Sequence, residues 1–202
     1  MDALQEIGDP AGHSDATYWD EFFDKVTQTN AFEWYADTAD FVDVLTETQT
    51  KAHPAKPLSD AYFLHGGTGN SDLIFDLFNR HAISRSVAVD ISSVAISEMA
   101  TKSDEFRNNS ESKDTFDCKF VVGDVLLPIE TPTSERFDGY IDKGLFDAMM
   151  NKYDDDCKLK SSKLFKSAEG CVTSSGGFYL MVSLAEEHII RLLVDILDDE
   201  ER

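Results

Sequence analysis

The chain has 202 residues, a formal net charge of −21 and 42% hydrophobic residues, enough for one buried core and a single domain. No apolar run reaches the roughly 18 residues that a membrane span needs, and the acidic first residues lack the pattern of a secretory leader. The acidity disfavours nucleic acid as a substrate and favours a basic partner, or it serves solubility alone.

Three cysteines, Cys118, Cys157 and Cys171, are widely spaced in the sequence. An odd number at such distances is typical neither of a disulfide framework nor of a zinc site. We therefore expect reduced thiols, a cytoplasmic location and no metal site.

The N-terminal quarter consists of a polar start, a helical stretch and a connector. Residues 1–16 are polar and contain Gly and Pro, so we expect a flexible N-terminus ahead of one domain over 17–202. Aromatic and aliphatic residues recur through 17–48, which predicts N-terminal helices. The segment 49–59 contains prolines and is expected to be a connector.

Short apolar runs then alternate with helical patterns. The expected strands are 63–65, 86–89, 120–122, 137–141 and 178–182. The expected helices begin near Leu73 and Val94 and cover 156–168 and 189–197, with an exposed charged loop over 104–114. This alternation predicts an α/β fold in which a doubly wound, mostly parallel sheet is covered by helices on both faces.

The most specific signal lies at 61–71, where the apolar run Tyr-Phe-Leu enters a glycine-rich turn. Asp90 follows Gly69 by 21 residues and ends the second expected strand. This is the layout of a nucleoside-binding βαβ unit, in which glycines let the backbone approach a ligand and the acid binds the ribose hydroxyls. Asp124 and Asp142 follow the next two strands. Because ligands of such sheets lie beyond the carboxyl ends of the strands, we expect these residues to surround one crevice.

The glycine-rich turn also restricts the class of cofactor. It reads Gly67-Thr68-Gly69-Asn70-Ser71-Asp72 and lacks the third glycine of a dinucleotide fingerprint. No Gly-Lys-Ser/Thr follows it, which excludes a P-loop. A ligand with a ribose and an adenine but no phosphate fits better, and S-adenosylmethionine is the candidate. Asp90 would then bind the ribose, and Asp124 would lie near the adenine amino group.

A set of motifs extends beyond this turn. They are Tyr18-Trp19-Asp20, Phe32-Glu33-Trp34-Tyr35, Gly67 to Ser71, Val89-Asp90-Ile91-Ser92, Gly123-Asp124-Val125, Asp142-Lys143-Gly144-Leu145-Phe146-Asp147-Ala148 and Gly176 to His188. On these motifs the chain resembles, over nearly its whole length, the class I S-adenosylmethionine-dependent methyltransferases with their Rossmann-like sheet. Within them it is similar to the methyltransferase-like group that modifies lysines, or the N-terminus, of translation elongation factor 1-alpha.

The resemblance implies a site at the matching positions. The implied cofactor-binding residues are Trp19, Trp34, Gly67, Gly69, Asp90, Ile91, Asp124, Val125 and Lys143. The glycines would pass under the methionine portion, and the residues after the second and third strands would hold the ribose and adenine. Asp142 is the candidate catalytic residue, which would orient the substrate amine at the mouth beside Lys143. The tryptophans come from the helices of 17–48, which would cover the site. For them, plain helix packing is the other reading.

The sequence departs from the family in three places. His65 stands where many class I enzymes have an acid, and we interpret it as a strand-end histidine rather than a catalyst. Leu145 replaces a small polar residue, which would alter the substrate rim. The chain stops at Arg202 with no strand signal after Leu197, whereas the family usually ends in an antiparallel strand hairpin. Either the sequence is truncated, or the chain protects the open sheet edge by other means, such as a partner. An open edge predicts self-association or early melting.

These observations predict a methyltransferase that acts on a lysine or N-terminal amine of a basic protein such as elongation factor 1-alpha. The Asn/Asp-Pro-Pro-Tyr/Phe motif, which resemblance associates with nucleobase methylation, does not follow the fourth strand. Two alternatives stay open. One is a small-molecule methyltransferase, since fold alone does not set the substrate. The other is a catalytically weak relative that binds cofactor or partner without turnover.

Overall fold

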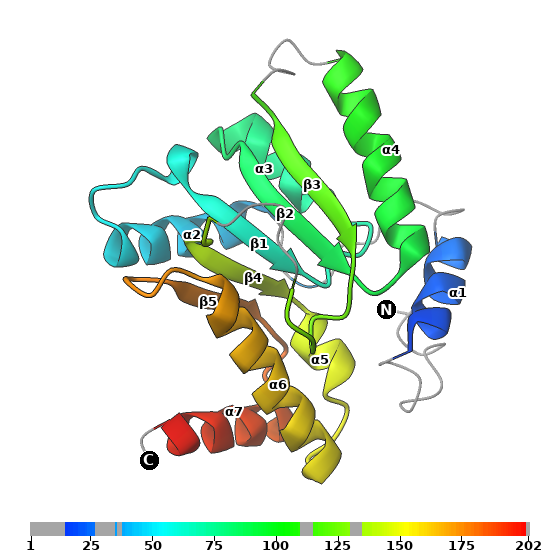
Figure 1. Cartoon of the computed structure of the whole chain (residues 1–202), viewed down its shortest axis with the longest axis vertical. Helices are drawn as coiled ribbons and strands as arrows, with labels where there is room; N and C mark the ends of the chain where they lie inside the picture. The colour runs from blue at the N-terminus through cyan, green and yellow to red at the C-terminus, as the bar shows by residue number, and fades with distance from the viewer. Residues whose placement is uncertain (1–14, 27–34, 36–37, 110–114, 130–134, 201–202) are drawn as a thin grey trace.

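A computed structural model describes residues 15–26, 35, 38–109, 115–129 and 135–200 (Figure 1). The helices in these ranges are α1 (Ala16–Val26), α2 (Thr38–Ala52), the 3-10 helix η1 (Leu58–Asp60), α3 (Leu73–His81), α4 (Ser93–Asn109), α5 (Leu145–Met149), α6 (Asp155–Cys171) and α7 (Glu187–Glu200). The strands are β1 (Tyr62–Gly66), β2 (Arg85–Asp90), β3 (Asp117–Val122), β4 (Gly139–Lys143) and β5 (Phe178–Val182).

The five strands form one sheet in the order β3-β2-β1-β4-β5, and every neighbouring pair is parallel. This confirms the predicted α/β fold with a parallel, Rossmann-like sheet. The strands β2 and β3 are added on one side of β1, and β4 and β5 are added on the other side, so the order of the strands reverses at β1. Such a switch point is where open α/β sheets bind ligands, outside the carboxyl ends of the strands.

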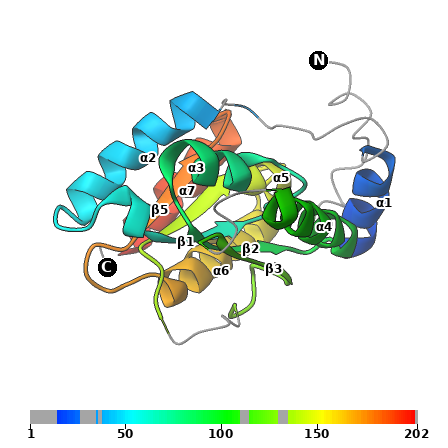
Figure 2. The same cartoon turned by 90° about the horizontal axis from the view of Figure 1, so that it is seen from above.

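Helices cover both faces of the sheet (Figures 1 and 2). Successive side chains of a strand point to opposite faces, so a parallel sheet with apolar strands needs a cover on each face. On one face, Phe63 of β1 packs with α2 and α3, and Ala88 of β2 packs with α3 and α4. On the other face, Leu64 and Val87 pack with residues of α5, α6 and α7. Three clusters of buried apolar side chains therefore fix the sheet between two helical layers and hold the strand ends in register.

Two segments expected to be irregular are helical. The predicted loop over 104–114 is wrong for its first part, because α4 runs to Asn109 and Phe106 packs its ring against Phe75 and Phe116. The rest of that segment, 110–114, lies outside the described residues. Likewise α2 continues through Ala52 into the expected connector, where it buries Gln49. In both cases tertiary packing overrides a polar local composition.

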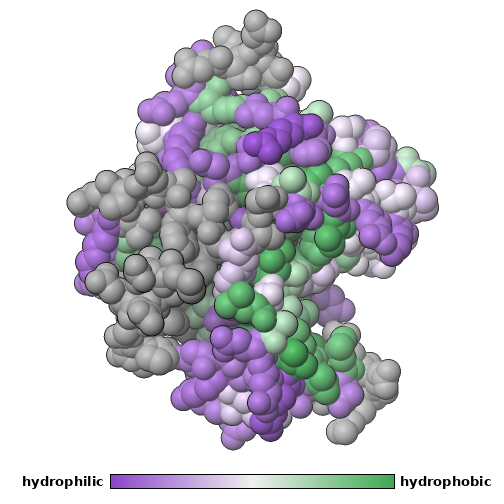
Figure 3. Space-filling model, turned by 180° about the vertical axis from the view of Figure 1, so that it is seen from behind, coloured by the Kyte–Doolittle hydropathy of each residue, from purple (hydrophilic) through white to green (hydrophobic). Residues whose placement is uncertain are grey.

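The sheet ends at β5, which has one strand neighbour among the described residues. Hydrophobic side chains gather over β5 and α7 beside a hollow in the molecular outline (Figure 3). The exposed large hydrophobic residues on and before α7 are Leu184, Ile190, Val194 and Leu197. Helix α7 is the last element of the described chain. Self-association through this edge stays a prediction, for sedimentation at increasing concentration to test.

Further expectations concern thiols, metals and membranes. Cys118, Cys157 and Cys171 are free and buried. Within the ranges that the structure covers, no cluster of three or more His, Cys, Asp or Glu residues is placed to hold a metal ion. None of the described helices combines the length and apolar character needed to cross a membrane.

Candidate functional site

A pocket lies at the carboxyl ends of the strands, and most of the residues singled out in the sequence line it. Those that do are Trp19, Gly67, Gly69, Asp90, Ile91, Asp124, Val125 and Lys143. They come from α1, the β1–α3 turn, the ends of β2 and β4, and the segments that follow β2 and β3. The parallel topology therefore brings together positions far apart in the chain. Their roles in binding a ligand stay predictions.

The glycine-rich turn forms a bare floor for this pocket. Gly67 and Gly69 have φ angles of 60° and 53°, in the left-handed region that glycine adopts without strain. A Cβ on Gly67 would lie 2.6 Å from a methyl carbon of Leu145, and one on Gly69 would lie 3.0 Å from the ring of Phe23. The backbone N–H of Thr68 donates to the Val89 carbonyl at 3.2 Å and fixes the turn against β2. Side chains at the two glycines would fill the space in which a ligand would lie.

Asp90 ends β2 and is 6% exposed. One of its carboxylate oxygens accepts a hydrogen bond from the backbone N–H of Gly69 at 2.8 Å, and the other accepts one from Ser92 at 2.9 Å. These bonds orient the carboxylate, and burial raises its pKa above the ordinary value. Each carboxylate oxygen has a second lone pair. The Ile91 N–H also acts on this carboxylate, which still keeps acceptor capacity for a ribose hydroxyl.

The segments after β2 and β3 form an apolar slot with one acid. Ile91 and Val125 line it, and Val125 is 5% exposed. Asp124 accepts a hydrogen bond from the backbone N–H of Leu126 at 2.9 Å. This bond shapes the turn in which Gly123 and Val125, on either side of Asp124, line the pocket. Apolar walls with a single polar group suit a flat, partly polar ring such as adenine.

The expected cover over the site is provided by α1 and not by α2. Trp19 and Phe23 of α1 line the pocket, whereas α2 packs against α3 and β5 on one face of the sheet. Helix α2 buries its apolar stripe, Phe41, Val42 and Leu45, in that core, so the stripe is not available to a ligand. The predicted residue Trp34 lies outside the described residues.

At the end of β4, the neighbouring residues Asp142 and Lys143 point to opposite faces of the sheet. Ile141 and Lys143 line the pocket, and because side chains alternate along a strand, Asp142 points to the opposite face. There it is fully buried and accepts hydrogen bonds from the Leu145 N–H at 2.8 Å and the Tyr179 hydroxyl at 2.6 Å. Burial raises the pKa of Asp142 to about 7, although the bond from Tyr179 opposes the shift. The expectation that Asp142 lies at the mouth is therefore wrong, and its catalytic role stays a prediction.

A second carboxylate of the same motif organises the rim beside β5. Asp147 accepts hydrogen bonds from the Ser183 hydroxyl and from the Leu184 N–H, the latter at 2.8 Å. It also bonds to the hydroxyl of Tyr35, whose pKa is raised by burial and by the nearby negative charge of Asp147. Asp147, which belongs to α5, thus connects this helix with Tyr35 and with residues 183–184. Other residues of α5, including Leu145, form a wall of the pocket.

Sequence reasoning assigned no site role to several pocket residues. His65 lines the pocket, is 3% exposed and lies 3.3 Å through Nε2 from the Ser86 hydroxyl. Burial lowers its pKa to about 3, so the ring is neutral. Phe23 reads in sequence as an ordinary apolar position of a helix, and Met149 belongs to α5, a helix too short to give a periodic signal. In the sequence, only the spacing of Gly67 and Gly69 could have suggested that large side chains such as Phe23 surround these two glycines.

Comparison with known proteins finds relatives of the chain in sequence. No family model matches the chain. It is 32% identical over 181 residues to the eEF1A lysine and N-terminal methyltransferase homolog of Drosophila pseudoobscura pseudoobscura, covering 89% of this chain and 24% of that protein. It is 29% identical over 179 residues to the eEF1A lysine and N-terminal methyltransferase of Mus musculus, covering 89% of this chain and 23% of that protein. The chain therefore spans about a quarter of the length of these curated relatives.

Solved structures support the fold. An S-adenosylmethionine-dependent methyltransferase from Anabaena variabilis matches with a TM-score of 0.56 at 14% identity, covering 93% of this chain and 68% of that one. The magnesium protoporphyrin IX methyltransferase of Synechocystis matches with a TM-score of 0.51 at 14% identity, covering 90% and 83%. The predicted resemblance is thus confirmed: the chain has the fold of S-adenosylmethionine-dependent methyltransferases and is related in sequence to the eEF1A lysine and N-terminal methyltransferases.

Proposed function

We propose that this chain is an S-adenosylmethionine-dependent methyltransferase domain that modifies an amine of a basic protein, a lysine side chain or an N-terminus, with elongation factor 1-alpha as the substrate. One observation carries the proposal. The bare Gly67–Gly69 turn, Asp90 and the slot at Ile91 and Val125 line a single pocket at the switch point of the sheet.

The residues present fit this cofactor along its length. The glycine turn leaves room for the methionine portion, and Lys143 would meet its carboxylate. Asp90, which the Gly69 and Ser92 N–H groups orient, would accept from the ribose hydroxyls. Ile91 and Val125 would enclose the adenine ring. When bound, S-adenosylmethionine supplies a methyl group on a positively charged sulfur, and the protein's contribution is to position the reactants.

The substrate amine must be held in its neutral form, because a protonated amine has no lone pair to react. Burial against Trp19, Phe23 and Leu145 would disfavour the charged ammonium. Asp142 fixes the start of α5 through the Leu145 N–H and thereby sets this wall. In this arrangement Asp142 acts on the substrate only through α5, and direct contact with the amine would require the side chain to leave its buried position.

The acidity of the chain supports a basic protein substrate. With a net charge of −21, the surface attracts positively charged partners over long range and accelerates their encounter. Asp147 and Glu186 both lie close to Tyr35 at the rim beside β5, so negative charge is present next to the pocket as well. The identity of the partner rests on the names of the sequence relatives. A cytoplasmic location accords with this partner and stays a prediction.

The test is transfer of labelled methyl groups from S-adenosylmethionine to purified elongation factor 1-alpha, with and without the chain. We expect label on the protein, at a rate that falls steeply as salt is added. The Asp90→Ala variant, which lacks the ribose-binding carboxylate, is the control for cofactor dependence.

The same assay in a protein-free metabolite extract and in whole lysate separates the alternatives. Label on a small molecule and on no protein would contradict the proposed substrate and favour a small-molecule methyltransferase. Cofactor binding without label on any acceptor would favour a relative that binds without turnover.

A further inference from the structure

Helix α1 is fastened to the cofactor-side loop by a residue that does not line the pocket. Its residues Trp19 and Phe23 line the pocket, and Asp20, between them in sequence, is directed at the start of α4. The Asp20 carboxylate accepts hydrogen bonds from the Ser92 hydroxyl at 2.7 Å, the Ser93 hydroxyl at 3.2 Å and the Val94 N–H at 3.2 Å. A carboxylate at this place is favoured because the first N–H groups of a helix carry partial positive charge.

Ser92 connects this contact to the ribose-binding acid. It is fully buried, donates its backbone N–H to Asp90 at 2.9 Å and donates its hydroxyl to Asp20. Asp90 in turn accepts from the N–H of Gly69, and the ring of Phe23 lies over that glycine. A closed circuit therefore runs from α1 to α4, through Asp90 to the glycine turn, and back to α1.

Ser92 couples the two acids of this circuit. Asp20 and Asp90 are both acidic and share Ser92, and the negative charge of Asp20 contributes to the raised pKa of Asp90. The hydrogen bond from the Ser92 hydroxyl lowers the pKa of Asp20 and so favours its ionised form, while the same hydroxyl caps α4 by accepting from the Ala95 N–H at 3.2 Å. Ser92 therefore both holds α1, through Asp20, and orients Asp90.

We propose that Asp20 is a positioning residue for the cofactor: it docks α1 on the start of α4, so that Trp19 and Phe23 close over a ligand bound at Asp90 and Gly69. This inference rests on the proposed function and adds to it the device that retains the cofactor. Undocking of α1 precedes ligand release, so Asp20 sets the rate at which the ligand leaves.

The experiment compares Asp20→Ala with Asp20→Asn and Asp24→Ala. Asp24 is exposed on the same helix, so Asp24→Ala makes the same change in charge without touching α4. S-adenosylhomocysteine, which has no methyl group to transfer, is the probe. Its affinity is measured by calorimetry and its dissociation by stopped-flow fluorescence, while hydrogen exchange reports the protection of α1.

We expect Asp20→Ala to weaken binding about tenfold, as for lost hydrogen bonds to a charged group, mainly through faster dissociation. Amides of α1 should exchange faster even without ligand. Asp20→Asn, which keeps one acceptor oxygen, should restore part of the affinity, and Asp24→Ala should match the wild type. A fall in melting temperature with unchanged affinity and dissociation would show a structural role only and overturn the inference.

Failure of the proposed function gives a different result. If the wild-type chain does not bind S-adenosylhomocysteine, the proposed cofactor is contradicted and this inference falls with it. If the wild type binds and Asp20→Ala behaves like Asp24→Ala in every measurement, the inference alone is overturned.

Discussion

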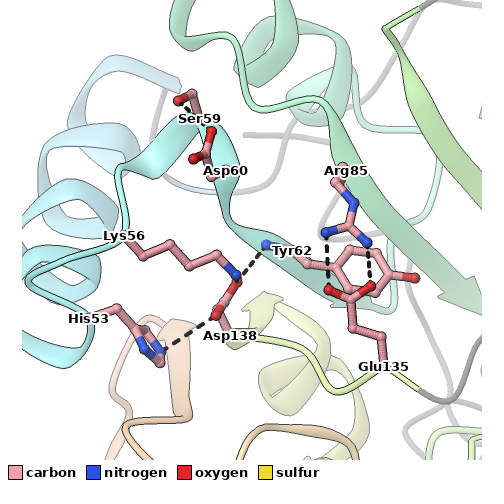
Figure 4. Close-up of polar contacts among 8 residues, drawn as sticks. All are labelled: His53, Lys56, Ser59, Asp60, Tyr62, Arg85, Glu135 and Asp138. Atoms are coloured by element: carbon pink, nitrogen blue, oxygen red, sulfur yellow. Dashed lines mark hydrogen bonds and ion pairs between the residues drawn. The ribbon is translucent and has the colours of Figure 1, made fainter.

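The two ends of the parallel strands both contain buried carboxylates, but they compensate the charge differently. At the amino end, Asp138 accepts a hydrogen bond from the Lys56 ammonium at 2.6 Å and another from the Tyr62 N–H at 2.7 Å (Figure 4). Arg85 and Glu135 form a second ion pair beside it. At the carboxyl end, Asp90 and Asp142 are bonded only to N–H and hydroxyl groups of the described chain.

This difference separates structural acids from acids that can serve a ligand. A buried carboxylate with an ammonium partner is compensated, and its contribution is to hold segments together. Asp90 and Asp142 have no cationic partner, and burial raises the pKa of both. Asp90 also lines the pocket, where it can accept a hydrogen bond from a ligand hydroxyl. The ion pairs at the amino end should therefore affect stability without affecting binding, and the buried groups at the carboxyl end should determine binding and the pH dependence of stability.

The largest expected effects come from two buried groups at the carboxyl end, Asp142 and His65. The pKa of Asp142 is about 7 in the folded chain and 3.8 ordinarily, so between these values the folded state holds a proton that the unfolded state has lost. Stability contributed by this group is therefore lost as the pH rises from about 4 to about 7. Asp142→Asn removes the titration and should exceed the wild type by on the order of 4 kcal/mol at pH 8, with little difference at pH 4. Urea unfolding at both pH values measures this, and parallel profiles would contradict it.

His65 acts in the opposite direction over nearly the same range. Burial lowers its pKa from 6.5 to about 3, so the unfolded chain binds a proton that the folded chain does not. Stability contributed by the neutral ring is present above about pH 6.5 and is lost as the pH falls toward 3. His65→Gln should remove a loss on the order of 5 kcal/mol across this range. A variant that loses stability on acidification as steeply as the wild type would show that His65 is not buried as described.

At the amino end, Asp138→Ala should lower the free energy of unfolding by about 3 kcal/mol, because it leaves the Tyr62 N–H without its acceptor and Lys56 without its partner. The effect is below that of a fully buried pair, since the Lys56 side chain is 35% exposed. Asp60→Ala, an exposed acid nearby, is the control and should change stability by less than about 0.5 kcal/mol. Affinity of the folded Asp138→Ala variant for S-adenosylhomocysteine should equal that of the wild type, and a parallel loss of affinity would remove the distinction between the two ends.

The smallest effect on stability is expected at the pocket floor. Gly67→Ala should lower the free energy of unfolding by about 1–2 kcal/mol, because alanine is strained at a φ of 60° and its Cβ would meet Leu145. It should also weaken binding of the probe. The matched control is Gly170→Ala in α6, where a Cβ meets nothing within 4 Å and should stabilise the helix. Urea unfolding and calorimetry on both variants measure the contrast, and equal effects would argue against a conformational need for Gly67.

The sequence was sufficient for the fold because its signals are local. Each strand is a short apolar run, and the turn at Gly67 and the acid at Asp90 have a spacing that a βαβ unit requires. It was insufficient wherever a side chain's direction depends on neighbours. Alternation along β4 turns Asp142 away from the pocket, and Phe106 keeps α4 helical through a polar segment. The bonds of Asp20 to the start of α4 join residues more than 70 positions apart, which no local pattern predicts.

The central claim is that the pocket at the carboxyl end binds S-adenosylmethionine through Asp90. Calorimetric titration of S-adenosylhomocysteine into the wild-type chain and into Asp90→Ala tests it most directly, with circular dichroism to confirm that the variant is folded. The account predicts one site per chain in the wild type and, in the variant, a loss of about 1.5–3 kcal/mol of binding free energy from the missing bonds to a charged group. No binding by the wild type, or equal affinity in a folded Asp90→Ala variant, would contradict it.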